Sequence, residues 1–243
     1  MTQDGSKGDR VALVTGAAKG MGRAIAVALS GRVSGVAVHY RGSSEEARET
    51  VAEIERLGNR AASFGADLTD EGRAADLVRK VEDAFGRLDV LVNNIGPFLV
   101  KPWQDLTGGD WDAVFRGVLE SAHFCMKAAL PGMRSRRWGR VINIGYSRAE
   151  QLGSFPTIAP YAIAKTGLLI LTRTAAVSEV ANGVTVNMVS PGLMEGGVLP
   201  PGKIPPAAIG KFADVAEAVA FLASDKAAAV TGANLVVAGT WKM

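Results

Sequence analysis

A tyrosine and a lysine stand four residues apart, at Tyr161 and Lys165, in a segment with helical apolar periodicity. Residues spaced by four lie on one face of a helix, so the phenol and the ammonium are expected to point into one pocket. A free phenol has a pKa near ~10, which is too high for efficient proton transfer at neutral pH. A neighbouring ammonium stabilises the phenolate and lowers that pKa. The pair therefore predicts an acid–base site in which Tyr161 exchanges the proton.

A glycine-rich turn, TGAAKGMG, follows the first apolar run and precedes a helical segment at 21–30. Glycine allows a tight turn and a close backbone approach, and a helix N-terminus offers free N–H groups and a favourable dipole to a pyrophosphate. Between the first strand and the first helix of a βαβ unit, this spacing predicts a dinucleotide site. The residues of this turn that are expected to bind the cofactor are Gly16, Lys19, Gly20, Met21 and Gly22.

The end of the second predicted strand favours NADP(H) over NAD(H). NAD sites place an acidic residue there for the ribose hydroxyls, whereas NADP sites place a cation for the 2′-phosphate. Here the strand is followed by Arg41, and the first carboxylate is Glu45. Arg41 and Lys19 are expected to clamp the phosphate, and Ser43 adds a hydroxyl donor.

Other strand ends complete the predicted cofactor site. Asp67 follows the third strand, where its carboxylate would accept from the adenine amino group, although it fits a cap of the turn at Thr69 equally well. Gly96 follows the fourth strand and would let the backbone approach the nicotinamide ribose, whereas Asn93 is interpreted as structural. The residues contributed by these strand ends are Asp67, Leu68, Asn94, Gly96, Pro191 and Gly192.

These residues must be positioned by alternating strands and helices. The apolar runs are rich in Val, Ile and Leu without polar alternation, which is typical of strands covered on both faces. The rhythm predicts an α/β protein of Rossmann type: a doubly wound parallel sheet with helices on both faces. The expected strands are 10–15, 35–40, 61–66, 88–93, 140–144, 184–189 and 234–238. The expected helices are 21–30, 44–57, 70–85, 110–133, 159–180 and 214–223, with N-caps at Asp70 and Asp214.

Length and composition exclude several classes of protein. The 243 residues, 48% hydrophobic and 21% charged, indicate one globular domain spanning 1–243. A single cysteine and two histidines exclude a disulfide framework and make a metal site unexpected. The net charge of +3 is spread along the chain, which argues against a nucleic-acid partner. Without a secretory signal or a long apolar run, we expect a cytoplasmic protein with no membrane segment.

One interval breaks the alternation of strands and helices. Residues 192–210 contain five glycines and four prolines, so they cannot form a regular helix. Long irregular segments in compact domains are usually lids or binding loops. The segment is therefore predicted to be a substrate lid.

Together, the glycine turn, the Tyr161–Lys165 pair and the strand ends resemble the short-chain dehydrogenase/reductase family over essentially the full chain. The C-terminal FLASDK and VTG segments are similar to bacterial 3-oxoacyl-[acyl-carrier-protein] reductases. The resemblance implies a seven-stranded sheet, a homotetramer or homodimer built on the fourth and fifth helices, and hydride transfer between NADP(H) and a carbonyl or alcohol. It implies that Tyr161 donates the proton and that a serine orients the carbonyl. Lys165 would hold the ribose hydroxyls and lower the pKa of Tyr161.

Two positions depart from the family pattern. The fifth strand usually ends in a serine, but here Tyr146 aligns with that serine and Ser147 follows it. We favour Ser147 as the residue that orients the carbonyl and keep Tyr146 as the alternative. The family's fourth helix carries an asparagine whose backbone kink and side chain anchor a water leading to the lysine. Val118 takes that position here, with Ser121 as a weak substitute, so proton resupply must differ.

The resemblance to the carrier-protein reductases is incomplete around the substrate. Arg137 matches one arginine that docks the acyl carrier protein, within a basic stretch that also holds Arg134, Arg136 and Arg140, but the second docking position is Asn182. The lid is also about eight residues shorter than in those reductases. The prediction is an NADPH-dependent reductase of a 3-oxoacyl thioester or another small ketone.

Two other functions stay open. The segment VHYR after TGAAK is similar to pteridine reductases, which reduce a C=N bond and place an acid upstream of the tyrosine. Glu150 is the nearest acid here. A regulator or partner subunit that binds NADP(H) without catalysis is the second alternative, suggested by Val118 and the irregular serine position.

Overall fold

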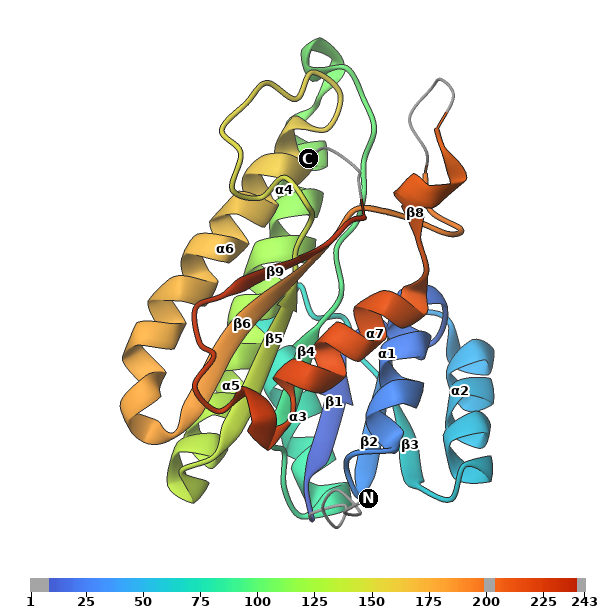
Figure 1. Ribbon diagram of the computed structural model, residues 1–243, viewed down its shortest axis with the longest axis vertical. Coiled ribbons are helices and arrows are strands. Elements are labelled where there is room, and N and C mark those ends of the chain that lie inside the picture. Colours follow the sequence, from blue (N-terminus) through green and yellow to red (C-terminus); the bar gives the residue numbers. More distant parts are fainter. Residues whose placement is uncertain (1–8, 199–203, 240–243) are drawn as a thin grey trace.

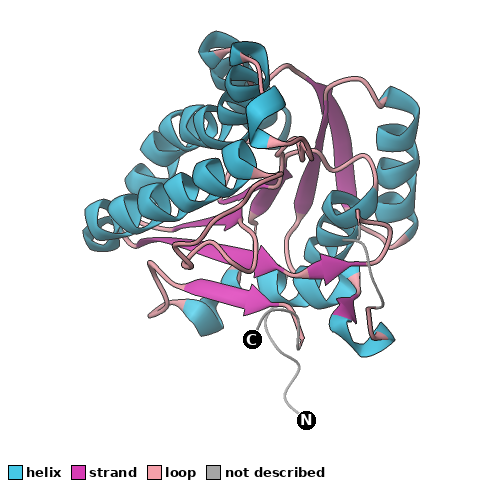
Figure 2. Ribbon diagram, turned by 90° about the horizontal axis from the view of Figure 1, so that it is seen from above, coloured by secondary structure: helices cyan, strands magenta, loops and turns pink. Residues whose placement is uncertain are grey.

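A computed structural model describes residues 9–198 and 204–239 of the chain. The described residues form a seven-stranded parallel sheet in the order β3-β2-β1-β4-β5-β6-β9, with helices on both faces (Figure 1, Figure 2). The expected doubly wound α/β fold is therefore confirmed. The strands are β1 (Val11–Val14), β2 (Gly35–Tyr40), β3 (Arg60–Gly65), β4 (Val90–Asn93), β5 (Gly139–Ile144), β6 (Val184–Pro191) and β9 (Asn234–Val237).

The helices lie close to the expected ranges. They are α1 (Gly20–Ser30), α2 (Ser44–Arg56), α3 (Glu71–Phe85), α4 (Gly108–Phe115), α5 (Ser121–Arg136), α6 (Ala159–Glu179) and α7 (Phe212–Leu222). Asp70 caps α3 as expected, since its side chain accepts from the Arg73 amide. The prediction that Asp214 is an N-cap is wrong: α7 begins two residues earlier, and Asp214 accepts from the Lys211 amide from the third helical position.

Two apolar layers hold the helices on the sheet. Residues of α1, α2 and α7 form one buried cluster with β1, β2 and β4, including Ile25, Ile54 and Val219. Residues of α3 and α5 form a second cluster on the opposite face, including Leu77 and Met133. The five inner strands are buried from both sides, which explains why they are apolar without alternation, whereas the edge strands β3 and β9 are partly exposed.

The fourth predicted helix is interrupted. Where the pattern predicts one helix over 110–133, the structure has α4, a π-helical turn at Arg116–Glu120, and then α5. The hydroxyl of Ser121 donates to the Gly117 carbonyl inside this turn (2.8 Å). The apolar periodicity of the segment does not reveal a π turn, because one added residue shifts the pattern only slightly.

The sheet order changes direction between β1 and β4, which lie side by side. In open α/β sheets, ligands bind in the crevice at the carboxyl ends of the strands next to such a switch point. The Gly/Pro-rich segment 192–210 lies beyond the end of β6 and contains two short paired strands, β7 (Leu193–Met194) and β8 (Ile209–Gly210). Its residues 199–203 lie outside the described part of the chain. Within the described ranges, every helix is too short or too polar to cross a membrane.

Candidate active site

The glycine turn is built by close backbone contacts. Gly16 and Gly20 have positive φ angles of 63° and 58°, which glycine adopts without strain. A Cβ on Gly22 would lie 2.2 Å from the Gly16 carbonyl oxygen, so only glycine fits where α1 passes the end of β1. Asn94 fixes the turn from β4, since its side-chain amide donates to the carbonyls of Thr15 (2.9 Å) and Gly16 (3.2 Å).

His39 is a site residue that the sequence analysis missed. It is fully buried at the end of β2, where its Nδ1 accepts from the Gly16 amide (3.1 Å). Its Nε2 lies 3.1 Å from the Ala66 carbonyl, and because a carbonyl can only accept, Nε2 carries the proton. Burial lowers the pKa of His39 to about 4 against the opposing effect of the Ala66 bond, so the ring is neutral at pH 7. The signal in the sequence was a histidine inside an apolar strand directly before the proposed phosphate clamp.

A cavity of about 490 Å³ opens at this switch point. It brings together several residues that were predicted to bind the cofactor: Gly16, Arg41, Asp67, Leu68, Asn94 and Gly96. His39 and Ser121 also line it. The cavity runs from the glycine turn to the loop after β4, so predicted residues that follow four strands, β1 to β4, share one crevice.

Of the predicted phosphate clamp, Arg41 lines this cavity and is exposed, whereas Lys19 and Ser43 are not among its lining residues. Arg41 follows β2 directly and takes part in none of the ion pairs found among the described residues. Lys19 is the N-cap residue of α1, and its Nζ lies 3.5 Å from a carboxylate oxygen of Glu46. Ser43 precedes α2 as its N-cap residue without a side-chain capping bond. Met21 is in the first turn of α1, half-buried against the core.

Asp67 supports both interpretations given above. One of its carboxylate oxygens accepts from the amide (3.1 Å) and the hydroxyl (2.8 Å) of Thr69. These two bonds lower the pKa of Asp67, and the charges of Arg41 and Arg73 act in the same direction. The carboxylate is therefore charged, fixed by the turn and placed on the wall of the cavity. The cap and the ligand contact do not exclude each other.

A chain of side-chain hydrogen bonds positions α6, the helix that carries the predicted catalytic pair. Asn93 at the end of β4 donates to Asn143 of β5 (2.8 Å), and Asn143 donates to the hydroxyl of Thr172 on α6 (2.9 Å). All three side chains are buried, so these bonds replace water and fix α6 against the carboxyl ends of the strands. Asn93 thus has the structural position expected for it.

Tyr161 and Lys165 lie on one face of α6, as their spacing predicts. The Lys165 Nζ lies 5.7 Å from the centre of the Tyr161 ring and donates to the Ile144 carbonyl at the end of β5 (2.5 Å). A Cβ on Gly96 would lie 3.1 Å from Nζ, so glycine leaves room for the lysine where it meets the cofactor cavity. Lys165 therefore lies directly behind Gly96, a residue of the cavity wall, and Tyr161 lies one helical turn away on the same face of α6.

The expected lowering of the phenol pKa is not found in the chain alone. Burial raises the pKa of Tyr161, and in second place the neighbouring phenol of Tyr146 acts in the same direction. Burial also lowers the pKa of Lys165 to about 7, because its nearest partner is a neutral carbonyl and not a carboxylate. At pH 7 the phenol is protonated and the ammonium is near its titration midpoint. A protonated phenol is suited to donating a proton.

The two candidate hydroxyls after β5 take different positions. The ring of Tyr146 packs edge-on against that of Tyr161, with centres 5.6 Å apart and planes at 72°. Its phenol oxygen is buried without a hydrogen-bond partner among the described residues. Ser147 is half-buried, and its amide donates to the carbonyl of Pro191 (2.8 Å), which connects this turn to the end of β6. The next residue, Gly192, packs so tightly that a Cβ would lie 2.7 Å from that of Ala238.

Val118 lies where the resemblance places an asparagine. Its side chain is fully buried in the π turn, and one methyl would lie 3.4 Å from a Cβ on Gly96. A valine offers no hydrogen bond to Lys165, and the Ser121 hydroxyl is bonded to the Gly117 carbonyl. The backbone distortion of this helix is thus present without the asparagine.

The arginines predicted to form a basic docking stretch are mostly paired. Arg134 donates to Glu179 and Arg136 to Asp89. The interpretation of Arg140 as part of a basic surface is wrong, because its side chain is 3% exposed. Trp138 is stacked between Arg140 and Arg10, whose guanidinium carbons lie 4.3 and 3.9 Å from the ring centre.

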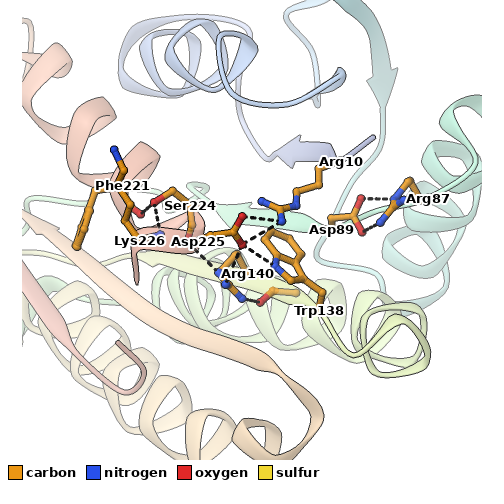
Figure 3. Close-up of polar contacts among 10 residues, drawn as sticks. Arg10, Arg87, Asp89, Trp138, Arg140, Phe221, Ser224, Asp225 and Lys226 are labelled. Carbon is orange, nitrogen blue, oxygen red and sulfur yellow. Dashed lines mark hydrogen bonds and ion pairs between the residues drawn. The ribbon is translucent and has the colours of Figure 1, made fainter. Parts of the chain in front are cut away.

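Asp225 closes this cluster from the other end of the chain, as Figure 3 shows. Its carboxylate accepts from Arg10 (2.8 Å) and from the Trp138 indole (3.0 Å). Arg137 remains exposed and donates to the Ala181 carbonyl (2.9 Å). Of the four arginines, it is the one without a carboxylate partner among the described residues.

Comparison with known proteins agrees with this geometry. A family model described as enoyl-(acyl carrier protein) reductase matches residues 16–240. The 3-oxoacyl-[acyl-carrier-protein] reductase FabG of Staphylococcus aureus is 36% identical over 238 residues, which cover 94% of this chain and 96% of that protein. The (2S)-[(R)-hydroxy(phenyl)methyl]succinyl-CoA dehydrogenase subunit BbsD of Thauera aromatica is 34% identical over 241 residues, covering 95% and 96%.

Solved structures show the same relationship. A short chain dehydrogenase from Burkholderia cenocepacia J2315, in complex with NADP, superposes with a TM-score of 0.88 at 32% identity. The match covers 97% of this chain and 98% of that one. The chain belongs to the short-chain dehydrogenase/reductase family.

Proposed function

We propose that the protein is an NADPH-dependent reductase that converts a carbonyl, in a 3-oxoacyl thioester or another small ketone, to an alcohol. The observation that carries the proposal is the position of Lys165, which contacts Gly96 in the wall of the cavity at the glycine turn and lies beside Tyr161 on α6. Relatives described as reductases and dehydrogenases, and a structural neighbour in complex with NADP, support it.

The residues around the cavity fit a dinucleotide phosphate. The glycine turn presents backbone N–H groups where a side chain would clash, and the N-terminus of α1 points the same way. At the end of β2, Arg41 provides a cation where an NAD site would have a carboxylate. Arg41 and Ser43 would hold the 2′-phosphate. Lys19 would exchange its ion pair with Glu46 for a contact with the same phosphate. Asp67 would accept from the adenine amino group.

The chain's own residues supply the proton and stabilise the charge that follows. When bound, the reduced nicotinamide supplies a hydride to the carbonyl carbon. Tyr161, protonated because burial raises its pKa, gives its proton to the carbonyl oxygen as the C–O bond becomes single. Lys165 in its charged form stabilises the resulting phenolate. A hydroxyl of the turn after β5, Ser147 or Tyr146, orients the carbonyl oxygen between these groups.

The candidate acid of the pteridine reductase alternative is paired elsewhere. Glu150, named above as the nearest candidate, is half-exposed and paired with Arg173 on the surface of α6. It therefore contributes no contact to the Tyr161 pocket. The non-catalytic alternative rests on Val118 and on the pairing of Ser121, and it is decided by turnover.

Several finer parts of the proposal concern the surroundings of the site. Segment 192–210 would act as the lid, since it follows β6 beside the turn of Ser147. Arg137 is the residue left to meet an acidic carrier protein. A homotetramer or homodimer would cover Ile163, Ile170 and Val177, which are exposed at seven-residue spacing along α6. The expected compartment is the cytoplasm.

Following NADPH oxidation over a panel of ketones, acetoacetyl thioesters and pterins tests the function. We expect turnover on a ketone or thioester, and Tyr161→Phe is expected to lower kcat/KM by roughly 10²–10⁴-fold, because the proton donor is lost. NADPH binding, measured by fluorescence titration, should stay within twofold in the variant. Full activity of Tyr161→Phe would refute the assigned role. Binding of NADPH without turnover on any member of the panel would favour the regulator.

A further inference from the structure

We propose that the phenol of Tyr146, and not the Ser147 hydroxyl, is the second group that hydrogen-bonds the substrate carbonyl, and that its ring limits the size of the group beside that carbonyl. The inference rests on the proposed carbonyl reduction at Tyr161. It names both a catalytic contact and a specificity-determining side chain.

The first support is a buried hydroxyl without a partner. Tyr146 is 9% exposed, and its phenol oxygen makes no hydrogen bond within the described residues. A buried unpaired hydroxyl lowers the stability of the fold, and a phenylalanine would fill the same space without that cost. A phenol left unpaired beside a reactive group is therefore available to a ligand that brings the missing acceptor.

The second support is the position of the ring. Tyr146 and Tyr161 are in edge-on contact, with centres 5.6 Å apart. A carbonyl oxygen close enough to take the Tyr161 proton would thus arrive beside Tyr146. A second donor placed there stabilises the negative charge that develops on that oxygen. Ser147 contributes its backbone amide to Pro191, and none of its described contacts involves Tyr161.

The third support concerns space. Tyr161 is flanked on another side by Phe98, whose ring centre is 4.9 Å away at 86°. Tyr146 in turn contacts Phe155, with centres 6.1 Å apart, and Phe155 lines an apolar cavity of about 460 Å³ with Trp103 and Trp111. The reactive phenol therefore lies between two rings, and Tyr146 stands between it and Phe155. The space beside the Tyr161 phenol, between the rings of Phe98 and Tyr146, therefore fits a carbonyl with a small neighbouring group. A shorter side chain at position 146 would connect this space to the apolar cavity.

The experiment separates the effect of the Tyr146 hydroxyl from that of its ring by measuring kcat/KM of the full chain with NADPH. Substrates are a small ketone, ethyl acetoacetate, and a bulky one, ethyl benzoylacetate. Tyr146→Phe removes only the hydroxyl: we expect kcat/KM on ethyl acetoacetate to fall roughly 10–100-fold, with NADPH affinity within twofold and an unfolding midpoint that is unchanged or higher. Tyr40→Phe, the matched loss of a phenol hydroxyl on β2, should keep kcat/KM within twofold.

Two further variants complete the test. Tyr146→Ser restores a donor on a short side chain, and we expect it to raise the ratio of kcat/KM for the bulky over the small ketone at least tenfold. Ser147→Ala should lose less activity than Tyr146→Phe.

Three results would overturn the inference alone while the wild type still reduces both ketones. These are full activity of Tyr146→Phe, a larger loss in Ser147→Ala than in Tyr146→Phe, or an unchanged size ratio in Tyr146→Ser. If the wild type binds NADPH and reduces neither ketone nor any other carbonyl, the proposed function fails and the inference fails with it.

Discussion

The two halves of the site treat their polar groups in opposite ways. Around the glycine turn, the side chains of Thr15, His39 and Asn94 hydrogen-bond neighbouring backbone groups. Around α6, the Tyr146 phenol has no described partner and Lys165 has a neutral one. The polar groups of the first half are thus held in place by the fold itself, whereas those of the second lack the partners that a substrate would bring in the proposed reaction. The proposed function would in this way assign binding and chemistry to separate parts of the site.

The largest expected effect concerns Arg41, which differs from the other polar groups near the glycine turn because it has no ion partner in the described part of the chain. Arg41 is a cation at the cavity rim without an ion partner among the described residues. Arg41→Glu is expected to lower the ratio of kcat/KM with NADPH to that with NADH by roughly 100-fold or more, because an attraction for the 2′-phosphate becomes a repulsion. Arg48→Glu on the exposed face of α2 is the matched control. Equal ratios in Arg41→Glu and wild type would show that another residue selects the cofactor.

A second prediction tests whether the half of the site around the glycine turn depends on a neutral histidine. The pKa of His39 is about 4 in the fold and 6.5 in its absence, so the unfolded chain binds the extra proton between these values. Stability therefore falls as pH decreases from 6.5 towards 4, by roughly 2–3 kcal/mol from this group. His39→Asn cannot titrate there and should flatten that part of the curve, as measured by urea unfolding at several pH values. Parallel curves would contradict the assignment.

A third prediction concerns the part of the site on α6, where the effect is gradual and grows with pH. Lys165 has a lowered pKa of about 7, so its charge is lost as pH rises through neutrality. In the proposed mechanism the cation stabilises the phenolate left after proton donation, so kcat/KM for reduction is expected to fall about tenfold per pH unit above that value. NADPH affinity over the same range should change less. A flat profile from pH 6 to 9 would show that Lys165 stays charged in the working enzyme.

Most of the fold follows from local signals in the sequence. Buried parallel strands give apolar runs, so both limits of β2 are predicted correctly and those of the other six strands of the main sheet within two residues. The π turn at Arg116–Glu120 leaves no such signal. The start of α7 was placed late because Asp214 acts at the third helical position, a role that an acidic residue fills as readily as the N-cap.

The sequence predicts which residues of the candidate site lie together better than it predicts their pKa values. Spacing alone places Tyr161 beside Lys165, and strand ends alone place Gly16 beside Asn94. The direction of the pKa shifts was not predictable, because it depends on burial that a sequence does not state. His39 and Tyr146 were underestimated for the same reason: their importance lies in what their polar atoms meet or fail to meet.

The wider turn at Arg116–Glu120 gives this helical segment room for one residue more than a regular helix would hold. Bonds that span five residues close a turn with one residue more than an α-helical turn does. The rotation of about 100° that an added residue would impose on a regular helix is therefore taken up within this one turn. One extra residue thus enters the segment while Met126 and Met133, further along, still pack in the cluster that α5 forms with α3 and β5.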